Sequence, residues 1–147
     1  MKMNFSMNIK KLNETATIPT YGSASAAGAD LYACEAVTIA AGETVLVHTG
    51  IAMAIPDGYV GLIYARSGLA TKRGLAPANK VGVIDSDYRG EIMVALHNHG
   101  KTEQTVEAGE RIAQIVFTPY VAASFSLVEE LDTTDRGAGG FGSTGRR

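Results

Sequence analysis

The chain has 147 residues, of which 46% are hydrophobic and 19% are charged, and its formal net charge is −2. This length and apolar content predict one globular domain with its own core. The small negative charge excludes a broad basic surface for nucleic acid or an acidic membrane, so we expect neither partner. Any bound phosphate must then be held by local arginines, backbone amides or a metal ion.

The N-terminal residues and the cysteine content bear on the cellular compartment. Polar residues interrupt residues 1–10 too often for the apolar run of a signal peptide, and no window reaches transmembrane length. Cys34 is the only cysteine, so an intramolecular disulfide is impossible and a reducing compartment is the simpler assumption. We expect a soluble, intracellular protein of the cytoplasm.

Short apolar runs separated by clusters of Gly, Pro, Asn and Asp predict an all-β chain. In residues 45–55 every second residue is apolar or threonine, and the run ends at the turn signal Pro56-Asp57-Gly58. We interpret it as one long strand with one buried face. Further strands are expected at 60–64, 91–97 and 112–120. Many short strands in one modest domain predict a two-sheet sandwich or jelly roll.

Residues 66–74 depart from this pattern and predict a strand followed by a short helix. Ser67 is a candidate capping residue, helix-tolerant residues follow it, and Gly74 ends the segment. Free backbone amides at such a helix start attract anions. The alternative interpretation is an ordinary capped helical turn.

The centre of the chain, residues 79–91, carries an apolar run that ends in Asp85, Asp87, Tyr88 and Arg89. We predict a hairpin with its polar residues concentrated near the turn. In strand parity Asp85 and Asp87 face the same side, where two carboxylates can divide water activation from structural or metal contact. The alternative is an acidic hairpin turn.

Other candidate residues favour structural explanations. His97 and His99 have metal-like spacing, but without a clear third protein ligand an exposed strand end explains them better. Cys34 has no recognisable histidine partner, so we interpret it as a small buried side chain.

The last twelve residues contain five glycines, one aromatic ring, hydroxyls and arginines. Glycine makes ordering this segment entropically costly, so we expect a mobile arm that closes over a ligand with a flat base and phosphate. The alternative is a disordered terminus. The expected division is a domain at 1–135 and a flexible arm at 136–147.

Five segments, taken together, resemble the ordered motifs of the trimeric dUTPase family. They lie at 27–33, 66–70, 82–90, 109–114 and 136–145. The resemblance spans nearly the whole chain and implies a jelly-roll homotrimer with active sites between subunits. It also implies hydrolysis of dUTP to dUMP and pyrophosphate with Mg²⁺, which limits uracil in DNA and supplies dUMP for dTMP synthesis.

The central motif implies the chemistry of the site. Asp85 resembles the carboxylate that orients and deprotonates the attacking water. Tyr88 resembles the residue whose ring lies beneath the deoxyribose and leaves no room for a ribose 2′-hydroxyl. Asn79 and the following hairpin, with Val83 and Ile84, resemble the reader of uracil.

The remaining motifs imply contacts to phosphate and metal. Arg66, Ser67 and Gly68 resemble the phosphate-gripping motif, and Gln114 resembles a further contact near the phosphates. Asp30 resembles an acidic residue on the metal and sugar side. Because Mg²⁺ usually bridges phosphate oxygens and retains waters, few or no direct protein ligands to it are expected.

The C-terminal motif resembles the arm that closes on the nucleotide, over the site of another subunit. The resemblance implies that the ring of Phe141 covers uracil. It assigns the triphosphate contacts to Arg136, Ser143 and Thr144, with Gly142 as a further substrate-binding residue.

Two alternatives differ from this assignment. A dCTP deaminase shares the fold and a similar Arg-Ser segment, but Ala95 falls where we expect the catalytic glutamate of that family. The other alternative is a non-catalytic nucleotide-binding jelly roll.

Ala65 stands where many dUTPases have proline, which removes a fixed φ angle but no functional side chain.

Overall fold

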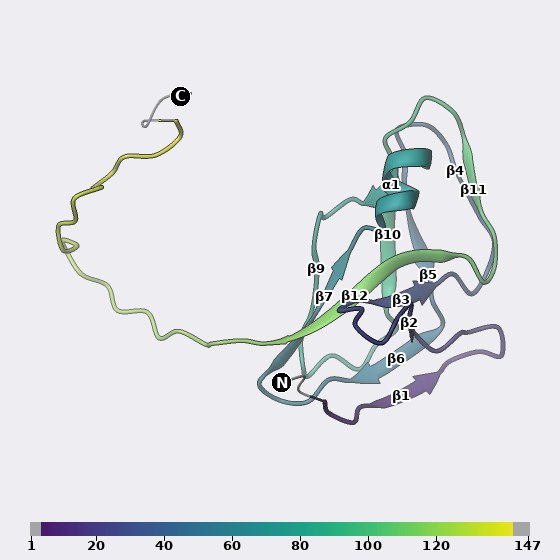
Figure 1. Ribbon diagram of the computed structural model, residues 1–147, viewed down its shortest axis with the longest axis horizontal. Helices are drawn as coiled ribbons and strands as arrows, with labels where there is room; N and C mark the ends of the chain where they lie inside the picture. Colours follow the sequence, from purple (N-terminus) through teal and green to yellow (C-terminus); the bar gives the residue numbers. More distant parts are fainter. Residues whose placement is uncertain (1–3, 143–147) are drawn as a thin grey trace.

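The computed structural model describes residues 4–142, which form twelve β-strands and one short helix (Figure 1). In chain order the elements are β1 (Asn8–Lys11), β2 (Thr20–Tyr21), β3 (Ala29–Tyr32), β4 (Val37–Ile39), β5 (Thr44–His48), β6 (Ile51–Ala54), β7 (Tyr59–Tyr64), α1 (Ser67–Arg73), β8 (Leu75–Pro77), β9 (Gly82–Ile84), β10 (Met93–Asn98), β11 (Gln104–Val106) and β12 (Arg111–Pro119). No helix among these residues is long and apolar enough to cross a bilayer.

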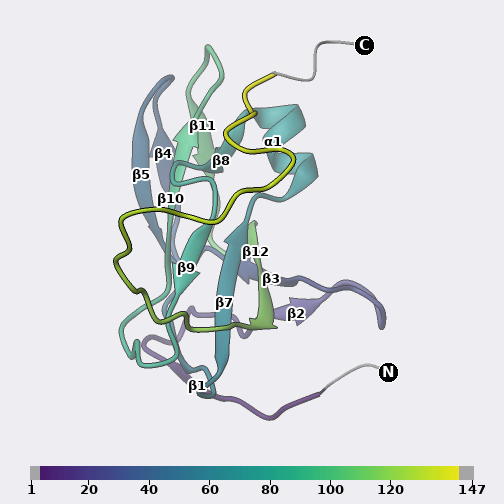
Figure 2. The same cartoon turned by 90° about the vertical axis from the view of Figure 1, so that its left-hand side faces the viewer.

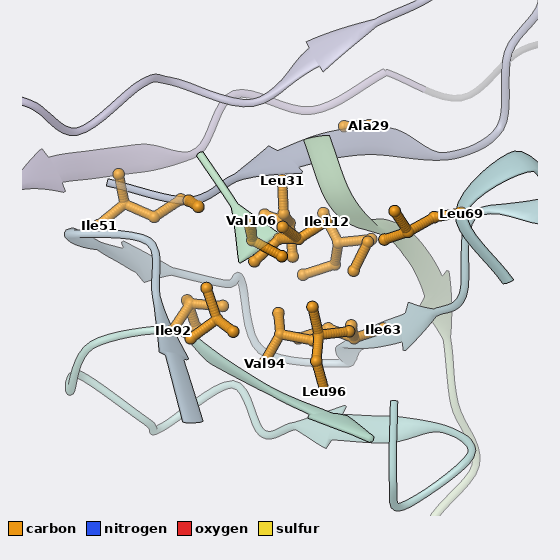
Figure 3. Packing of buried hydrophobic residues seen from close by; sticks show 14 of the residues in the cluster. Ala29, Leu31, Ile51, Ile63, Leu69, Ile92, Val94, Leu96, Val106 and Ile112 are labelled. Atoms are coloured by element: carbon orange, nitrogen blue, oxygen red, sulfur yellow. The ribbon is translucent and has the colours of Figure 1, made fainter. Parts of the chain in front are cut away.

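The strands pair antiparallel in four sheets. The largest has the order β2-β3-β12-β7-β9, and a second has the order β5-β10-β8, while β1 pairs with β6 and β11 with β4. Side chains of β3 and β12 point toward those of β10 across a shared core (Figure 3). The expected jelly-roll β-sandwich is confirmed.

The core consists of apolar side chains from both layers of the sandwich, one containing β3 and β12 and the other containing β10. Leu31, Val94, Leu96, Ile112 and Ile115 are at most 2% exposed. Ile112 and the next residue, Ala113, are both fully buried, because the register of β12 against β3 shifts between Arg111 and Ala113. Such a bulge lets two consecutive side chains face the core.

The single long strand expected at 45–55 is wrong, because Gly50 interrupts it. Gly50 has a φ of 67°, a left-handed conformation that breaks a strand and favours glycine. β5 therefore pairs with β10, whereas β6 pairs with β1. Val47, Thr49 and Ile51 are buried as their parity predicted, but Gly50 and Ala52 are buried too, so the alternation does not continue through the break.

The helix expected within 66–74 is present as α1, but its predicted serine cap is wrong. Arg66 occupies the N-cap position without a side-chain capping hydrogen bond, so Ser67 is the first helical residue. Gly74 ends the helix in the left-handed conformation, and its N–H donates to the carbonyls of Leu69 and Ala70. Burial of Leu69 holds the helix against the core.

The hairpin expected over 79–91 is also wrong. β9 pairs with β7, whereas the next strand, β10, pairs with β5 and β8. A turn closed by the Tyr88 N–H and the Asp85 carbonyl at 3.2 Å therefore links strands of two different sheets. The two strands separate because their apolar faces are buried in different layers.

The last strand ends at Pro119. Residues 121–147 are called the C-terminal arm below, and the described part of the arm, residues 121–142, contains no strand or helix. This described part runs away from the body of the molecule (Figure 1). Its apolar side chains include Val121, Phe125 and Leu127, which are at least 94% exposed. The domain boundary at residue 135 stays a prediction.

We expect Leu96→Ala to lower the free energy of unfolding by about 2 to 5 kcal/mol, because it leaves a cavity between the two layers. Urea denaturation at one fixed protein concentration measures the change. Leu12→Ala is the control, since Leu12 is 46% exposed. Equal effects of the two substitutions would contradict this account of the core.

Candidate functional site

The predicted site residues other than Asn79 fall into three groups. The Arg66 cluster comprises Asp30, Arg66, Ser67, Gly68 and Gln114. The Asp85 turn comprises residues 82–91, and the C-terminal arm is the third group. β7, β9 and β12 run side by side and connect the first two regions, with α1 at the end of β7 (Figure 2).

Strand pairing assembles the Arg66 cluster. On β12, Gln114 lies opposite Asp30 of β3 on one side and opposite Tyr64 of β7 on the other. The Gln114 Nε2 donates to the carbonyl of Ala65 at 2.9 Å, which ties the connection between β7 and α1 to the sheet. A side chain at Gly28 would begin 2.3 Å from the Gln114 Oε1 and would displace the Gln114 amide from this position.

Asp30 orients the cluster's arginine. Its Oδ1 accepts a hydrogen bond from the Arg66 Nε at 2.8 Å, and its Oδ2 lies 3.5 Å from the Arg111 Nη1. The Asp30 side chain is only 12% exposed, and a carboxylate this buried needs such partners. In the described part of the chain, the two terminal amino groups of Arg66 make no hydrogen bond, which leaves them as donors for an anion.

Ser67 and Gly68 are exposed in the first turn of α1, beside Arg66. Arg111 was not among the predicted site residues. Because Arg111 lies in the segment 109–114, that motif could have indicated it as a site residue. Its pairing with Asp30, however, depends on the register of β12 against β3.

The Asp85 turn borders two hollows. A cleft of about 710 Å³ and a smaller hollow of about 270 Å³ share Val83 and Asp85 in their walls. The cleft is lined by Asp57, Val60, Leu62, Val83, Asp85, Ser86, Asp87 and Tyr120. The smaller hollow is lined by Leu46, Val83, Ile84, Asp85, Tyr88, Glu91 and Met93. Asp85 and Asp87 line one cleft, but Ser86 between them lines it too, because these residues form a turn in which strand parity does not apply.

Tyr88 is held against its own turn. Its hydroxyl donates to the carbonyl of Glu91 at 2.9 Å. A side chain at Gly90 would begin 2.5 Å from the Tyr88 hydroxyl oxygen and 2.7 Å from ring carbon Cζ, so the ring lies directly over Gly90. Only glycine leaves room for this arrangement.

Asn79 lies apart from the hollows. It is exposed in the turn before β9, and its carbonyl accepts the Val81 N–H at 2.7 Å. It is absent from the residues that line either hollow. Within one chain, Val83, Ile84, Asp85 and Tyr88 come together without Asn79.

The described part of the C-terminal arm reaches neither group. The Arg136 Nε donates to the arm's own Gly139 carbonyl at 2.8 Å, and Phe141 is fully exposed with a φ of 50°. Gly142 follows with a φ of 89°. Ser143 and Thr144 lie outside the described residues.

Among residues 4–142, no side-chain hydrogen bond or ion pair joins the Arg66 cluster to the Asp85 turn. The arginine and amide donors therefore belong to one group, whereas the aromatic ring of Tyr88 and the carboxylates of Asp85 and Asp87 belong to another. A ligand that uses both groups must bridge two regions of the chain or two copies of it.

The described residues contain no group of three or more His, Cys, Asp or Glu side chains arranged to hold a metal ion.

His97 and His99 stack edge to face with ring centroids 4.4 Å apart. Partial desolvation is the largest cause that lowers the pKa of His99, and the positive charges of His97 and Lys80 lower it further. Cys34 is buried, as predicted.

The chain is similar to known proteins over nearly its whole length. The dUTPase family model matches residues 14–145. The deoxyuridine 5′-triphosphate nucleotidohydrolase of Acinetobacter baylyi is 47% identical over 150 residues, which cover 100% of both chains. The protein of the same name from an Enterobacter species is 50% identical over 133 residues, which cover 88% of each chain.

Solved structures agree with the sequence relatives. A mutant dUTPase of Staphylococcus bacteriophage 80alpha with dUpNHpp superposes with a TM-score of 0.89 at 28% identity, over 97% of this chain and 99% of that chain. A mutant dUTPase from phage phi11 of S. aureus, described for its coordination of a structural Mg(II) ion, gives a TM-score of 0.80 at 26% identity, over 86% and 98% of the two chains. The sequence match, the jelly-roll fold and these likenesses together establish that the chain belongs to the dUTPase family.

Proposed function

We propose that the chain is a homotrimeric enzyme that hydrolyses dUTP to dUMP and pyrophosphate with Mg²⁺. The observation that carries this proposal is the hollow shared by Asp85 and Tyr88, which offers a carboxylate beside an aromatic ring. The names of the relatives, and the dUpNHpp bound to a phage dUTPase, support the same substrate.

Asp85 acts as the general base. Its carboxylate orients a water and takes its proton as the water oxygen attacks the α-phosphorus in line with the bridging oxygen. The bond from the α-phosphorus to that oxygen breaks, and pyrophosphate leaves. In phosphoryl transfer the protein contributes mainly positioning and charge stabilisation, so an exposed carboxylate on a well-held turn suits this role.

Tyr88 and the neighbouring backbone select the nucleoside. The ring of Tyr88 lies beneath the deoxyribose and excludes a 2′-hydroxyl by contact, a repulsive selection against UTP. Asn79, Val83 and Ile84 read uracil. Support for this role comes from the hydrogen bond that limits movement of the Tyr88 ring.

The Arg66 cluster binds phosphate. Arg66 presents its terminal amino groups to phosphate oxygens because Asp30 holds its Nε, while Ser67, Gly68 and Gln114 provide neighbouring contacts. Asp30 acts on the ligand by holding Arg66. Its effect on the bound metal ion is likewise indirect.

The residues present fit a Mg²⁺ ion held mainly by the triphosphate and water. Both oxygens of Asp30 face arginines, and the described residues form no cluster of three metal-binding side chains. Mg²⁺ prefers oxygen ligands and often keeps several waters beside phosphates. When bound, the ion neutralises negative charge on the phosphate oxygens.

The complete site lies between subunits. Support comes from the separation of the Arg66 cluster from the Asp85 turn and from the exposed apolar side chains of the C-terminal arm. The arm closes over another subunit's site, with Phe141 covering uracil and Arg136, Ser143 and Thr144 contacting the triphosphate, while Gly142 is a further substrate contact.

The direct test incubates the purified protein with Mg²⁺ and either dUTP or dCTP, then quantifies nucleotides, pyrophosphate and ammonia. We expect dUMP and pyrophosphate from dUTP. Chelation by EDTA should lower the rate at least about tenfold, and added Mg²⁺ should restore it. Ammonia from dCTP, or no turnover of dUTP, would refute the proposed reaction.

Asp85→Asn should lower kcat for dUTP by about two to four orders of magnitude while nucleotide binding is retained, because the amide cannot accept the water's proton. Steady-state kinetics and equilibrium dialysis with a non-hydrolysable analogue measure the two effects. Asp57→Asn is the matched control, since Asp57 lines the same cleft without an assigned role. Near-normal turnover of the Asp85 variant would exclude it as the base.

Deletion of residues 136–147 should leave a folded trimer with very little activity, because the arm contributes contacts to the nucleotide and none to the core. Size-exclusion chromatography, circular dichroism and dUTP turnover test each part. A deletion of residues 146–147 alone is the control and should remain active. Failure of the longer deletion to fold would mean that the arm is structural.

A further inference from the structure

The carboxylate of Glu91 connects the end of the Asp85 turn to the break between β5 and β6. Its Oε2 lies 3.0 Å from the Nδ1 of His48, the last residue of β5. Its Oε1 accepts the backbone N–H of Gly50, the left-handed residue of the break, at 2.9 Å. The two side chains are 43% and 22% exposed, for His48 and Glu91 respectively, so water screens the ion pair only in part.

Backbone contacts extend this connection. The Ile92 N–H donates to the carbonyl of Ile51 at 2.8 Å, and the Thr49 hydroxyl donates to the carbonyl of Ile92. Residues 91–92 are therefore tied to the β5–β6 break through both side chain and backbone. The position of the Glu91 carbonyl follows from these ties.

Tyr88 depends on that carbonyl, because its hydroxyl donates to it at 2.9 Å. Glu91, Tyr88 and Asp85 also line the same hollow. A displacement of Glu91 therefore moves the hydrogen-bond acceptor that holds the Tyr88 ring. The ring in turn forms part of the wall beside Asp85.

We propose that His48 and Glu91 are positioning residues that set the enzyme's selectivity for the deoxyribose, by holding the carbonyl to which Tyr88 is bonded. The inference rests on the proposed function, in which Tyr88 excludes the ribose 2′-hydroxyl. His48 is absent from the residues that line the hollow shared by Asp85 and Tyr88, and Glu91 acts through its backbone carbonyl and its bond to His48.

The charge of His48 makes this selectivity depend on pH. The hydrogen bond to Glu91 raises the pKa of His48; desolvation opposes the shift, and the negative charges of Glu91 and Glu35 add to it. Among residues 4–142, these two glutamates are the charged groups that act on His48. Because the pKa is raised on folding, the pair is fully formed below the unfolded value of 6.5 and is lost as the pH rises through the folded value.

The experiment measures kcat/KM for dUTP and for UTP from about pH 5 to about pH 9. In the unsubstituted enzyme the dUTP to UTP ratio should fall roughly two- to fivefold as His48 loses its proton. Glu91→Gln and His48→Gln should show the lower ratio at every pH. His48→Lys should keep the higher ratio on the alkaline side, because lysine remains charged there.

His97→Gln is the matched control. His97 lies on the β10 strand that pairs with β5 and bonds the Thr44 hydroxyl, away from the Asp85 turn. This substitution should leave the dUTP to UTP ratio and its pH profile unchanged. A merely structural role of His48 would lower the yield or thermal stability without a pH-dependent change in selectivity.

Histidine NMR gives a readout that is independent of turnover. The pKa of His48 should fall toward its ordinary value in Glu91→Gln. Equal ratios in all variants, with normal dUTP hydrolysis by the unsubstituted enzyme, would overturn the inference alone. Absence of dUTP hydrolysis by the unsubstituted enzyme would refute the proposed function and this inference with it.

Discussion

The pairing of β12 with β3 on one edge and with β7 on the other is the constraint on which the Arg66 cluster depends. It buries Ile115 in the core while Gln114, its neighbour in sequence, faces Asp30 and the residues that lead into α1. A slip of one residue would exchange these faces, so the hydrophobic core and the polar cluster share one register. Core packing therefore holds the arginine and amide donors in place.

The Asp85 turn is held differently, because its two flanking strands belong to different sheets. Its backbone cannot rely on a continuous ladder of hydrogen bonds. The Tyr88 hydroxyl and the Glu91 side chain instead tie the turn to itself and to the β5–β6 break. Side-chain hydrogen bonds of this kind are individually modest, so small changes in charge can alter the position of an exposed ring.

Two of the three departures from the expected fold have causes that sequence patterns do not reveal. Alternation across 45–55 correctly indicated that Val47, Thr49 and Ile51 are buried. Periodicity, however, gives no sign of a left-handed glycine within an otherwise regular run. The polar segment between β9 and β10 is typical of a hairpin turn, yet pairing partners are chosen by burial in distant layers. Glu91 and His48 are also far apart in the sequence, and no local motif indicated that they pair.

By itself the sequence determined the all-β class, the short helix near Gly74, the buried parity of Val47 and Ile51, and membership of the dUTPase family. These features depend on local periodicity, on turn chemistry and on motifs that are contiguous in the chain. Only the tertiary structure decided that Asp30 lies between two arginines and that Glu91 reaches the β5–β6 break. Those contacts depend on strand register and on which sheet each strand joins, and the free energy of burying distant residues together sets both.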